Sequence, residues 1–488
     1  VQSHLGTTSV AATPAWLRRL SVPTGRAYQT TIARPWGLDY TGAPGLWEAG
    51  ITGAGIVVAS QDTGVQWDHP ALRERYRGWD ADNETSDHVY NWYDAWADGS
   101  RPSRCSADAQ VPCDDHGHGT HTVGTMLGNP AGDEPVIGMA PDATWIGCRN
   151  MENGNGTPAS YMACFEFFLA PYPQNGDPMI DGRPELAPHI INNSWGCPPS
   201  EGCDPDTLRQ VVETARAAGQ FVVASAGNKG FIGCESVEDP IAVYNATFSI
   251  GAHDSTGSLA SFSSRGPVMI DGSGRIKPDL AAPGVSVYSA WVNDAYMYNQ
   301  GTSMASPHVA GGAALLWSAA PELIGRIDLT EQVLAKSASP VNATICNPSG
   351  AAAVPNNLFG FGRLNVARAV DYARLAARVE LTVLDEAGLP LAGAVIELVD
   401  QLTGYRHGAT ADMAGEAVVE PIYAGSYTLE ISGAGTIPPL PLEIQLGESH
   451  GPRTVVAEGG AAIRYTVTVP SIMEEIEPEW FLPIVVQP

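Results

Sequence analysis

Short apolar runs that end abruptly in polar residues constrain the fold of this 488-residue chain most. Such runs, bounded by glycine and polar residues, are typical of strands buried on both faces of a parallel sheet. The runs are GIVVAS (55–60), HIINNSWG (189–196) and FVVASAGN (221–228), and patterns with one apolar helical face cover 159–170, 206–219 and 328–338. Strands that alternate with helices predict an α/β domain with a doubly wound, mostly parallel sheet.

Polar side chains follow the ends of these predicted strands. Asp62, Asn193, Ser194 and Asn228 each lie just past an apolar run. In doubly wound sheets, ligand-binding groups gather at the carboxyl ends of the strands. We therefore expect a functional site at this edge of the sheet.

The sequence pattern changes after residue 376. Alternating apolar and polar residues, separated by the turn signals EAG, MAG and YAG, predict a small all-β sandwich over 378–446. The chain starts at Val1 without the basic and apolar segments of a secretory signal, so we expect a processed or trimmed product. The predicted organisation is an N-terminal extension (1–40), the α/β domain (41–376), the sandwich (378–446) and a C-terminal tail (447–488).

Charge and cysteine content narrow the function. The chain has 26 Lys and Arg against 53 Asp and Glu, a net charge of −27, which argues against nucleic acid or an anionic membrane as partner. No apolar run reaches the length of a membrane-spanning helix. The eight cysteines contain no CxxC motif and favour disulfides in an oxidising compartment over free thiols in a cytosolic enzyme. Their pairing is left open.

Three glycine-rich segments carry the residue types of nucleophilic catalysis. Asp62 follows a strand in DTG, three histidines lie in DDHGHGTHTVG, and Ser303 lies in GTSMASPHVAG. A hydroxyl nucleophile needs a base to take its proton, and that base needs a carboxylate to orient it. The alternatives are a simple helix cap at Ser303 and a zinc site on His116, His118 and His121, although the HEXXH pattern is absent.

Together these motifs resemble the subtilisin-like serine proteases (subtilases). The order Asp, His, Ser and the signatures DTG, HGTH and GTSMASPHVAG carry the resemblance, which covers residues 40–376. The segments IGCRNM, CFEFFLAPYP and NNSWGCPPSEGC resemble the bacillopeptidase F-like branch of that family. The resemblance implies that Asp62 orients His118, that His118 is the general base and acid, and that Ser303 is the nucleophile. It also implies that the Asn228 side chain and the Ser303 backbone N–H bind the oxyanion.

The resemblance further implies a binding pocket for the P1 side chain of the substrate. Lys229 and Glu238 are expected near its floor or rim, unless both lie on solvated loops. An unpaired Glu238 would favour a basic P1 residue, whereas a Glu238 neutralised by Lys229 would leave the pocket broadly tolerant. The expected walls are Ser194, Trp195, Gly196, Ala226 and Gly227.

The sequence also suggests roles for residues outside the triad and the pocket. Asp114 and Asp115 either help to shape substrate binding or are solvated loop carboxylates, and we expect His121 and His308 to be packing or supporting residues. Subtilases commonly hold calcium through an Asp after the HP dipeptide, but here Ala71 follows it. An acidic loop such as 78–87 has the oxygen ligands that suit a calcium ion, but the sequence identifies no site there. We expect no metal ligand and no required cofactor.

These observations predict a secreted, extracellular serine endopeptidase that acts on proteins or peptides through an acyl-enzyme on Ser303. Two alternatives are a transpeptidase, in which an amine captures the same acyl-enzyme, and a catalytically silent binding protein. The sandwich resembles carboxypeptidase regulatory-like or collagen-binding B-type modules. We expect it to bind a surface or polymer or to act as a stabilising spacer, and we favour the spacer.

Overall fold

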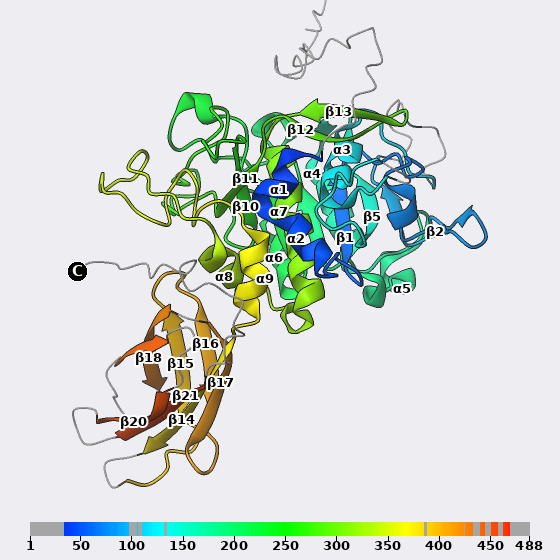
Figure 1. Ribbon diagram of the computed structural model, residues 1–488. Coiled ribbons are helices and arrows are strands. Elements are labelled where there is room, and N and C mark those ends of the chain that lie inside the picture. Colours follow the sequence, from blue (N-terminus) through cyan, green and yellow to red (C-terminus); the bar gives the residue numbers. More distant parts are fainter. Residues whose placement is uncertain are drawn as a thin grey trace, which may run out of the picture. The chain divides into compact units, whose positions relative to one another are not determined.

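A seven-stranded parallel sheet organises residues 34–376 in the computed structural model (Figure 1). Its strand order is β11-β10-β9-β8-β1-β5-β4, and every neighbouring pair is parallel. The strands are β1 (Val57–Asp62), β4 (Trp92–Asp94), β5 (Thr144–Arg149), β8 (Ile190–Asn193), β9 (Phe221–Ser225), β10 (Phe248–His253) and β11 (Leu280–Pro283). Because β5 and β8 flank β1 on opposite sides, the direction of winding reverses at β1.

The structure describes most of the chain, with gaps. The described residues are 34–96, 105, 110–130, 134–384, 388–423, 425–432, 440–444, 450–456 and 462–468. The predicted N-terminal extension to residue 33 and the end of the predicted tail from residue 469 lie outside them. None of the helices in the described part is both long and apolar enough to span a membrane.

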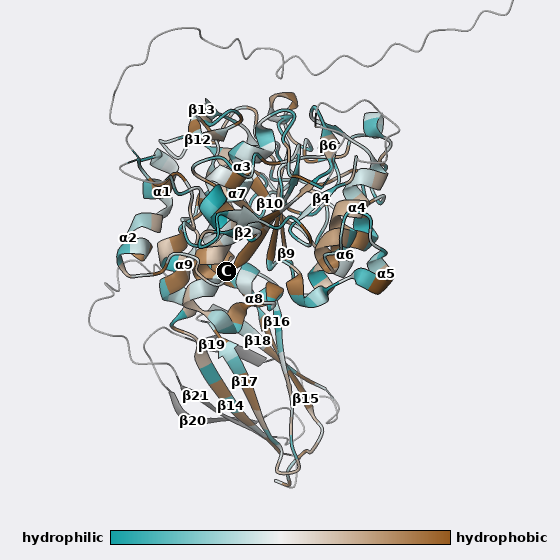
Figure 2. Ribbon diagram, turned by 90° about the vertical axis from the view of Figure 1, so that its right-hand side faces the viewer, coloured by the Kyte–Doolittle hydropathy of each residue, from teal (hydrophilic) through white to brown (hydrophobic). Residues whose placement is uncertain are grey.

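Helices cover both faces of the sheet. The buried helix α7 (Thr302–Ala319) packs on β8 to β11, and α3 (His118–Leu127) packs against β1 and α7. On the other face, α4 (Pro158–Leu169) contacts β1 and β5, and α6 (Arg209–Ala217) contacts β9. Each face has its own hydrophobic core, and the central strands and adjoining helices carry most of the brown, hydrophobic colour in Figure 2. A β-carbon on Gly311 would lie 2.5 Å from the Met126 carbonyl oxygen, so glycine allows α7 and α3 to pack this closely.

The remaining elements of this domain are shorter. They include five more helices, α1 (Trp36–Thr41), α2 (Ala43–Glu48), α5 (Pro178–Asp181), α8 (Ile327–Ser337) and α9 (Val366–Ala373), in the described part of the chain. Three two-stranded sheets complete it, formed by β2 (Trp79–Asp80) with β3 (Thr85–Ser86), β6 (Met151–Glu152) with β7 (Asn155–Gly156), and β12 (Val287–Trp291) with β13 (Ala295–Asn299). The predicted doubly wound α/β fold is confirmed, and the three apolar runs form β1, β8 and β9.

Two four-stranded antiparallel sheets form the C-terminal region, as the all-β prediction required. Their orders are β17-β14-β21-β20 and β16-β15-β18-β19. Inward residues that alternate along the strands, such as Val379, Leu381, Ile396 and Leu398, form a separate core. Whereas the sandwich was expected to end at residue 446, β20 and β21 lie beyond it, and β21 pairs with β14. The strands are β14 (Ala377–Leu384), β15 (Val395–Asp400), β16 (Arg406–Thr410), β17 (Glu416–Ile422), β18 (Gly425–Ser432), β19 (Leu440–Ile444), β20 (His450–Val456) and β21 (Ala462–Thr468).

All eight cysteines form disulfides. The pairs are Cys105–Cys113, Cys148–Cys164, Cys197–Cys203 and Cys234–Cys346. The last of these joins residues 112 positions apart.

Candidate active site

Asp62 and His118 meet where β1 ends and α3 begins. The Asp62 Oδ1 and His118 Nδ1 atoms are 2.7 Å apart, and the Asp62 side chain is 1% exposed. A carboxylate at Nδ1 selects the tautomer that leaves Nε2 as a base. The approach depends on Gly119, because a β-carbon there would lie 1.9 Å from the Gly64 carbonyl oxygen and 3.0 Å from the Asp62 Cβ.

The surroundings of His118 favour its charged form. Burial alone lowers the pKa of the imidazole, but the charge and hydrogen bond of Asp62, followed by the charge of Asp114, outweigh it. The pKa of His118 therefore lies above its usual value. This environment stabilises an imidazolium once the ring has taken up a proton.

Ser303 is the second residue of α7 and forms reciprocal hydrogen bonds with Ser194. The Ser303 Oγ donates to the Ser194 carbonyl at 3.0 Å, and the Ser194 Oγ donates to the Ser303 carbonyl at 2.9 Å. The second bond has a clear cause, because Pro307 has no N–H to donate to the carbonyl four residues earlier. Among the described residues Ser303 makes no hydrogen bond to His118, and such bonds often form only when substrate is present.

Two N–H donors converge beside Ser303. The Asn228 Oδ1 accepts from the Thr302 N–H at 2.9 Å and from the Thr302 hydroxyl at 3.1 Å, which leaves the Asn228 Nδ2 to donate. A β-carbon built on Gly301 would lie 3.5 Å from the Asn228 Nδ2 and 3.6 Å from the Ser303 nitrogen. Both nitrogens therefore lie beside the start of an 18-residue helix, where the positive end of the helix dipole favours a negative charge.

The predicted pocket walls follow two adjacent strands. Ser194, Trp195 and Gly196 come after β8, and Ala226 and Gly227 come after β9. The Trp195 side chain is 6% exposed and stacks on Tyr161 with ring centroids 4.0 Å apart, so its orientation is set. The hydroxyl of Ser194 is bonded to the Ser303 carbonyl of α7.

Lys229 pairs with two carboxylates beside these walls. Its Nζ lies 2.7 Å from Glu238 and 2.9 Å from Asp239. Burial opposes the charge of Lys229, but these partners outweigh it and raise the pKa of the ammonium group. Glu238 is thus paired, and Asp239 is a member of the group that the sequence analysis missed, although it directly follows Glu238.

The other histidines do not join the triad candidates. His121 is buried, its Nε2 lies 3.2 Å from the Val287 carbonyl, and burial lowers its pKa to about 3. His308 is buried on α7, its Nδ1 lies 2.8 Å from the Met304 carbonyl, and burial lowers its pKa to about 4. Both contacts fit the packing role that was expected.

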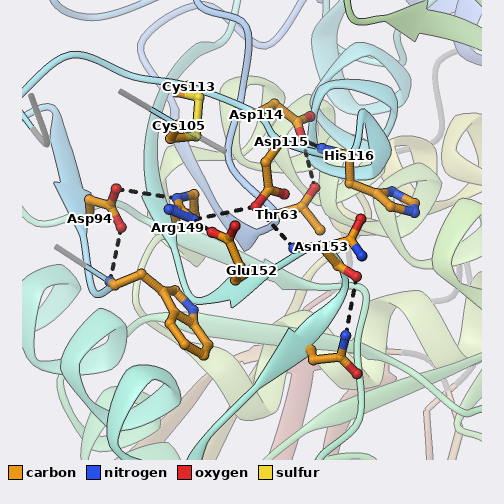
Figure 3. A network of polar contacts seen from close by, with 12 residues as sticks. Thr63, Asp94, Cys105, Cys113, Asp114, Asp115, His116, Arg149, Glu152 and Asn153 are labelled. Carbon is orange, nitrogen blue, oxygen red and sulfur yellow. Dashed lines mark hydrogen bonds and ion pairs between the residues drawn. A yellow bond between two sulfur atoms is a disulfide. The ribbon is translucent and has the colours of Figure 1, made fainter. Parts of the chain in front are cut away.

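Arg149 gathers three carboxylates next to the candidate triad (Figure 3). It lies at the end of β5 in register with Asp62 of β1 and has no exposed side-chain surface. It contacts Glu152 at 2.5 Å, Asp94 at 3.2 Å and Asp115 at 3.5 Å. Burial raises the pKa of Asp94 despite Arg149, and burial together with Glu152 raises that of Asp115. Asp115 is therefore not a solvated loop carboxylate. The residues next to it in the sequence did not indicate that it pairs with Arg149.

The residue after the HP dipeptide cannot contribute a side-chain ligand to a calcium ion. Ala71 is 1% exposed and has no side-chain oxygen. In the acidic loop, Asp80 accepts hydrogen bonds from Asp82 and Asn83, which lower its pKa. Within the described ranges, no three His, Cys, Asp or Glu side chains gather as a metal site would require.

The part of the chain that carries this site is similar to known proteins. Residues 53–362 match the Subtilase family. The chain is 39% identical to bacillopeptidase F of Bacillus subtilis (strain 168) over 350 residues, which are 71% of this chain and 22% of that protein. It is 32% identical to subtilisin DY of Bacillus licheniformis over 292 residues, 59% of this chain and 86% of that protein. It is also 32% identical to subtilisin E of Bacillus subtilis (strain 168) over 298 residues, 60% of this chain and 64% of that protein.

Proposed function

Because the chain belongs to the subtilase family, as its resemblance to the bacillopeptidase F-like branch predicted, we propose that it is a serine endopeptidase that hydrolyses peptide bonds in proteins. The observation that carries the proposal is that the Asn228 Nδ2 and the Ser303 nitrogen lie close to one point beside Gly301, at 3.5 and 3.6 Å, with the Asn228 Oδ1 already bonded to Thr302. Two donors at the N-terminus of a helix, next to a hydroxyl, match the needs of acyl transfer.

The proposed reaction forms an acyl-enzyme on Ser303 and then hydrolyses it. The Ser303 hydroxyl turns from the Ser194 carbonyl to His118, whose Nε2 takes its proton as Oγ attacks the substrate carbonyl. Asp62 holds the ring and stabilises the imidazolium. The oxyanion receives hydrogen bonds from Asn228 and Ser303, each contributing about 3 kcal/mol in the transition state. His118 then protonates the leaving amine, and water releases the acyl group by the reverse proton transfers.

The proposed substrate is an extended polypeptide. It would pair with the backbone of residues 194–196 as an added strand. Because Lys229 pairs with Glu238 and Asp239, we propose a P1 pocket that is broadly tolerant rather than strictly selective for basic residues. The chemistry requires no cofactor.

We also propose that the protein acts outside the cell and that its sandwich stabilises the catalytic domain. Four disulfides support an oxidising compartment. The structural role of the sandwich is supported by an ion pair between Lys336 of α8 and Asp400 of β15, with side chains 6% and 1% exposed. Gln332 of α8 donates to the same Asp400 at 3.1 Å.

A fluorophosphonate probe tests the proposal. Intact-mass analysis should find one adduct on the purified protein and none on Ser303→Ala, with digestion of a protein substrate by the first alone. A folded but unlabelled protein would refute the endopeptidase and favour the silent binding protein. Labelling with products that carry an added amine, rather than water, would instead favour the transpeptidase.

A further inference from the structure

Asp114 connects the two sides of the Asp62–His118 pair, and the sequence analysis gave it no such role. Its Oδ1 accepts from the Thr63 hydroxyl at 2.8 Å and from the N–H groups of His116 and Gly117 at 3.0 and 2.7 Å. Its Oδ2 accepts from the N–H and hydroxyl of Thr120 at 2.9 and 2.7 Å. An ordinary helix cap would bond only the first turn of α3, whereas Asp114 also bonds a residue 51 positions earlier.

Thr63 carries the connection to the carboxylate of the pair. Its backbone N–H donates to the Asp62 Oδ1 at 2.7 Å, the same oxygen that meets His118. Its hydroxyl donates to Asp114 and accepts from the Gly119 N–H at 3.1 Å. The end of β1 and the first turn of α3 are thus held by one carboxylate and one threonine.

The segment that carries Asp114 is itself anchored (Figure 3). Cys113, directly before it, is joined to Cys105 by a disulfide. Asp115, directly after it, accepts from the Asn153 N–H at 2.9 Å and lies 3.5 Å from the buried Arg149. These contacts hold the residues on either side of Asp114, so its hydrogen bonds can fix the positions of Thr63 and the first turn of α3 relative to each other.

We propose that Asp114 is a positioning residue of the hydrolytic reaction, which holds Asp62 and His118 in register through Thr63 and the first turn of α3. The inference rests on the proposed function. The charge of Asp114 also reaches the imidazole through space and favours its protonated form, second to Asp62. Loss of Asp114 should therefore alter both the rate of the chemical step and the titration of His118.

Asp114→Asn tests the proposal, because amide and carboxylate have nearly the same shape. We expect kcat to fall about 10- to 100-fold while KM changes little, since small misplacements of catalytic groups have effects of that size. The acid limb of kcat/KM should move to lower pH, because a negative charge near the imidazolium is lost. Thr63→Val, which cuts the same link from the other side, should lower kcat, and the double variant should lose less than the product of the two effects.

The matched control is Asp412→Asn in the sandwich. Asp412 also caps a loop, accepting from the N–H groups of Ala414 and Glu416 at 2.8 and 2.9 Å, but has no link to β1 or α3. The Asp412→Asn variant should have the same kcat and the same acid limb of kcat/KM as the parent. Unchanged kcat and acid limb in Asp114→Asn, with only a lower melting temperature, would overturn the proposal and leave Asp114 a loop cap.

A second readout separates this inference from the proposed activity. In Ser303→Ala protein, NMR titration of labelled histidine reports the His118 ring whether or not the enzyme is active. Asp114→Asn should lower the pH at which His118 titrates and weaken the downfield Nδ1 proton signal. An unchanged titration and signal would overturn the inference, whereas an inactive parent with the expected shift would count against the proposed function alone. If Asp114→Asn does not fold, weakening of the same proton signal in Thr63→Val decides the question.

Discussion

Replacing Arg149 by methionine should destabilise the protein strongly at neutral and alkaline pH. Arg149 has no exposed side-chain surface and is shared by Asp94, Asp115 and Glu152. Methionine fills much of the same volume but leaves these carboxylates without their cation. Removing one partner of a buried charge cluster costs about 3–5 kcal/mol of unfolding free energy, which is the loss that we expect at pH 8.

The size of this loss should depend on pH. Burial raises the folded-state pKa of Asp94 and Asp115 above the unfolded value. A raised carboxyl pKa contributes stability that is present below the unfolded pKa, about 4, and is lost as pH rises through the folded pKa. Without Arg149 these pKa values should rise further, so stability should fall more steeply between pH 4 and 8. The variant should therefore lie closer to the parent at pH 5 than at pH 8.

Denaturant unfolding in the Ser303→Ala background, which avoids self-digestion, would measure this difference at pH 5, 6.5 and 8. Arg378→Met is the control, because Arg378 forms its ion pairs with Glu380 and Glu420 at the surface and should show no such pH-dependent loss. An Arg149→Met variant within about 1 kcal/mol of the parent at pH 8, the range of surface pairs, would refute the reasoning. A loss of equal size at pH 5 and pH 8 would refute its electrostatic part.

Three further predictions concern catalysis and the disulfides. Asn228→Leu should lower kcat about 10²- to 10³-fold with KM nearly unchanged, because in the proposed reaction its amide binds the oxyanion of the transition state. An effect confined to KM in steady-state assays would contradict this. The kcat/KM of the parent should rise with pH through a value above the ordinary histidine pKa, since His118 must be neutral to act as base and its pKa is raised; a pH profile with its limb below about 6.5 would contradict it. Replacing Cys234 and Cys346 by serine opens a loop of 112 residues and should cost about 5 kcal/mol of unfolding free energy, and a change below about 1 kcal/mol in thermal unfolding would contradict that estimate.

Local patterns were enough to predict the α/β domain and the residues that its motifs carry. The apolar runs became β1, β8 and β9 because a short apolar segment bounded by glycine and polar residues has few other ways to be buried. Asp62, His118 and Ser303 could be proposed because the segments DTG, HGTH and GTSMASPHVAG that carry them resemble the signatures of the subtilases. The all-β character of the C-terminal region followed from its alternation, although strands continue past the expected end at residue 446.

Pairings between distant segments were decided only by the tertiary structure. The sequence offered Glu238 as the partner of Lys229, but the fold adds Asp239. It offered Asp114 and Asp115 as neighbours in one loop, but the fold directs Asp114 to Thr63 and Asp115 to Arg149. Whether a segment forms a strand or a helix depends on the burial and the backbone geometry of a few neighbouring residues. The sequence by itself determines this choice. Which charge faces which partner depends on how strands and helices far apart in the chain pack together, and no local pattern contains that information.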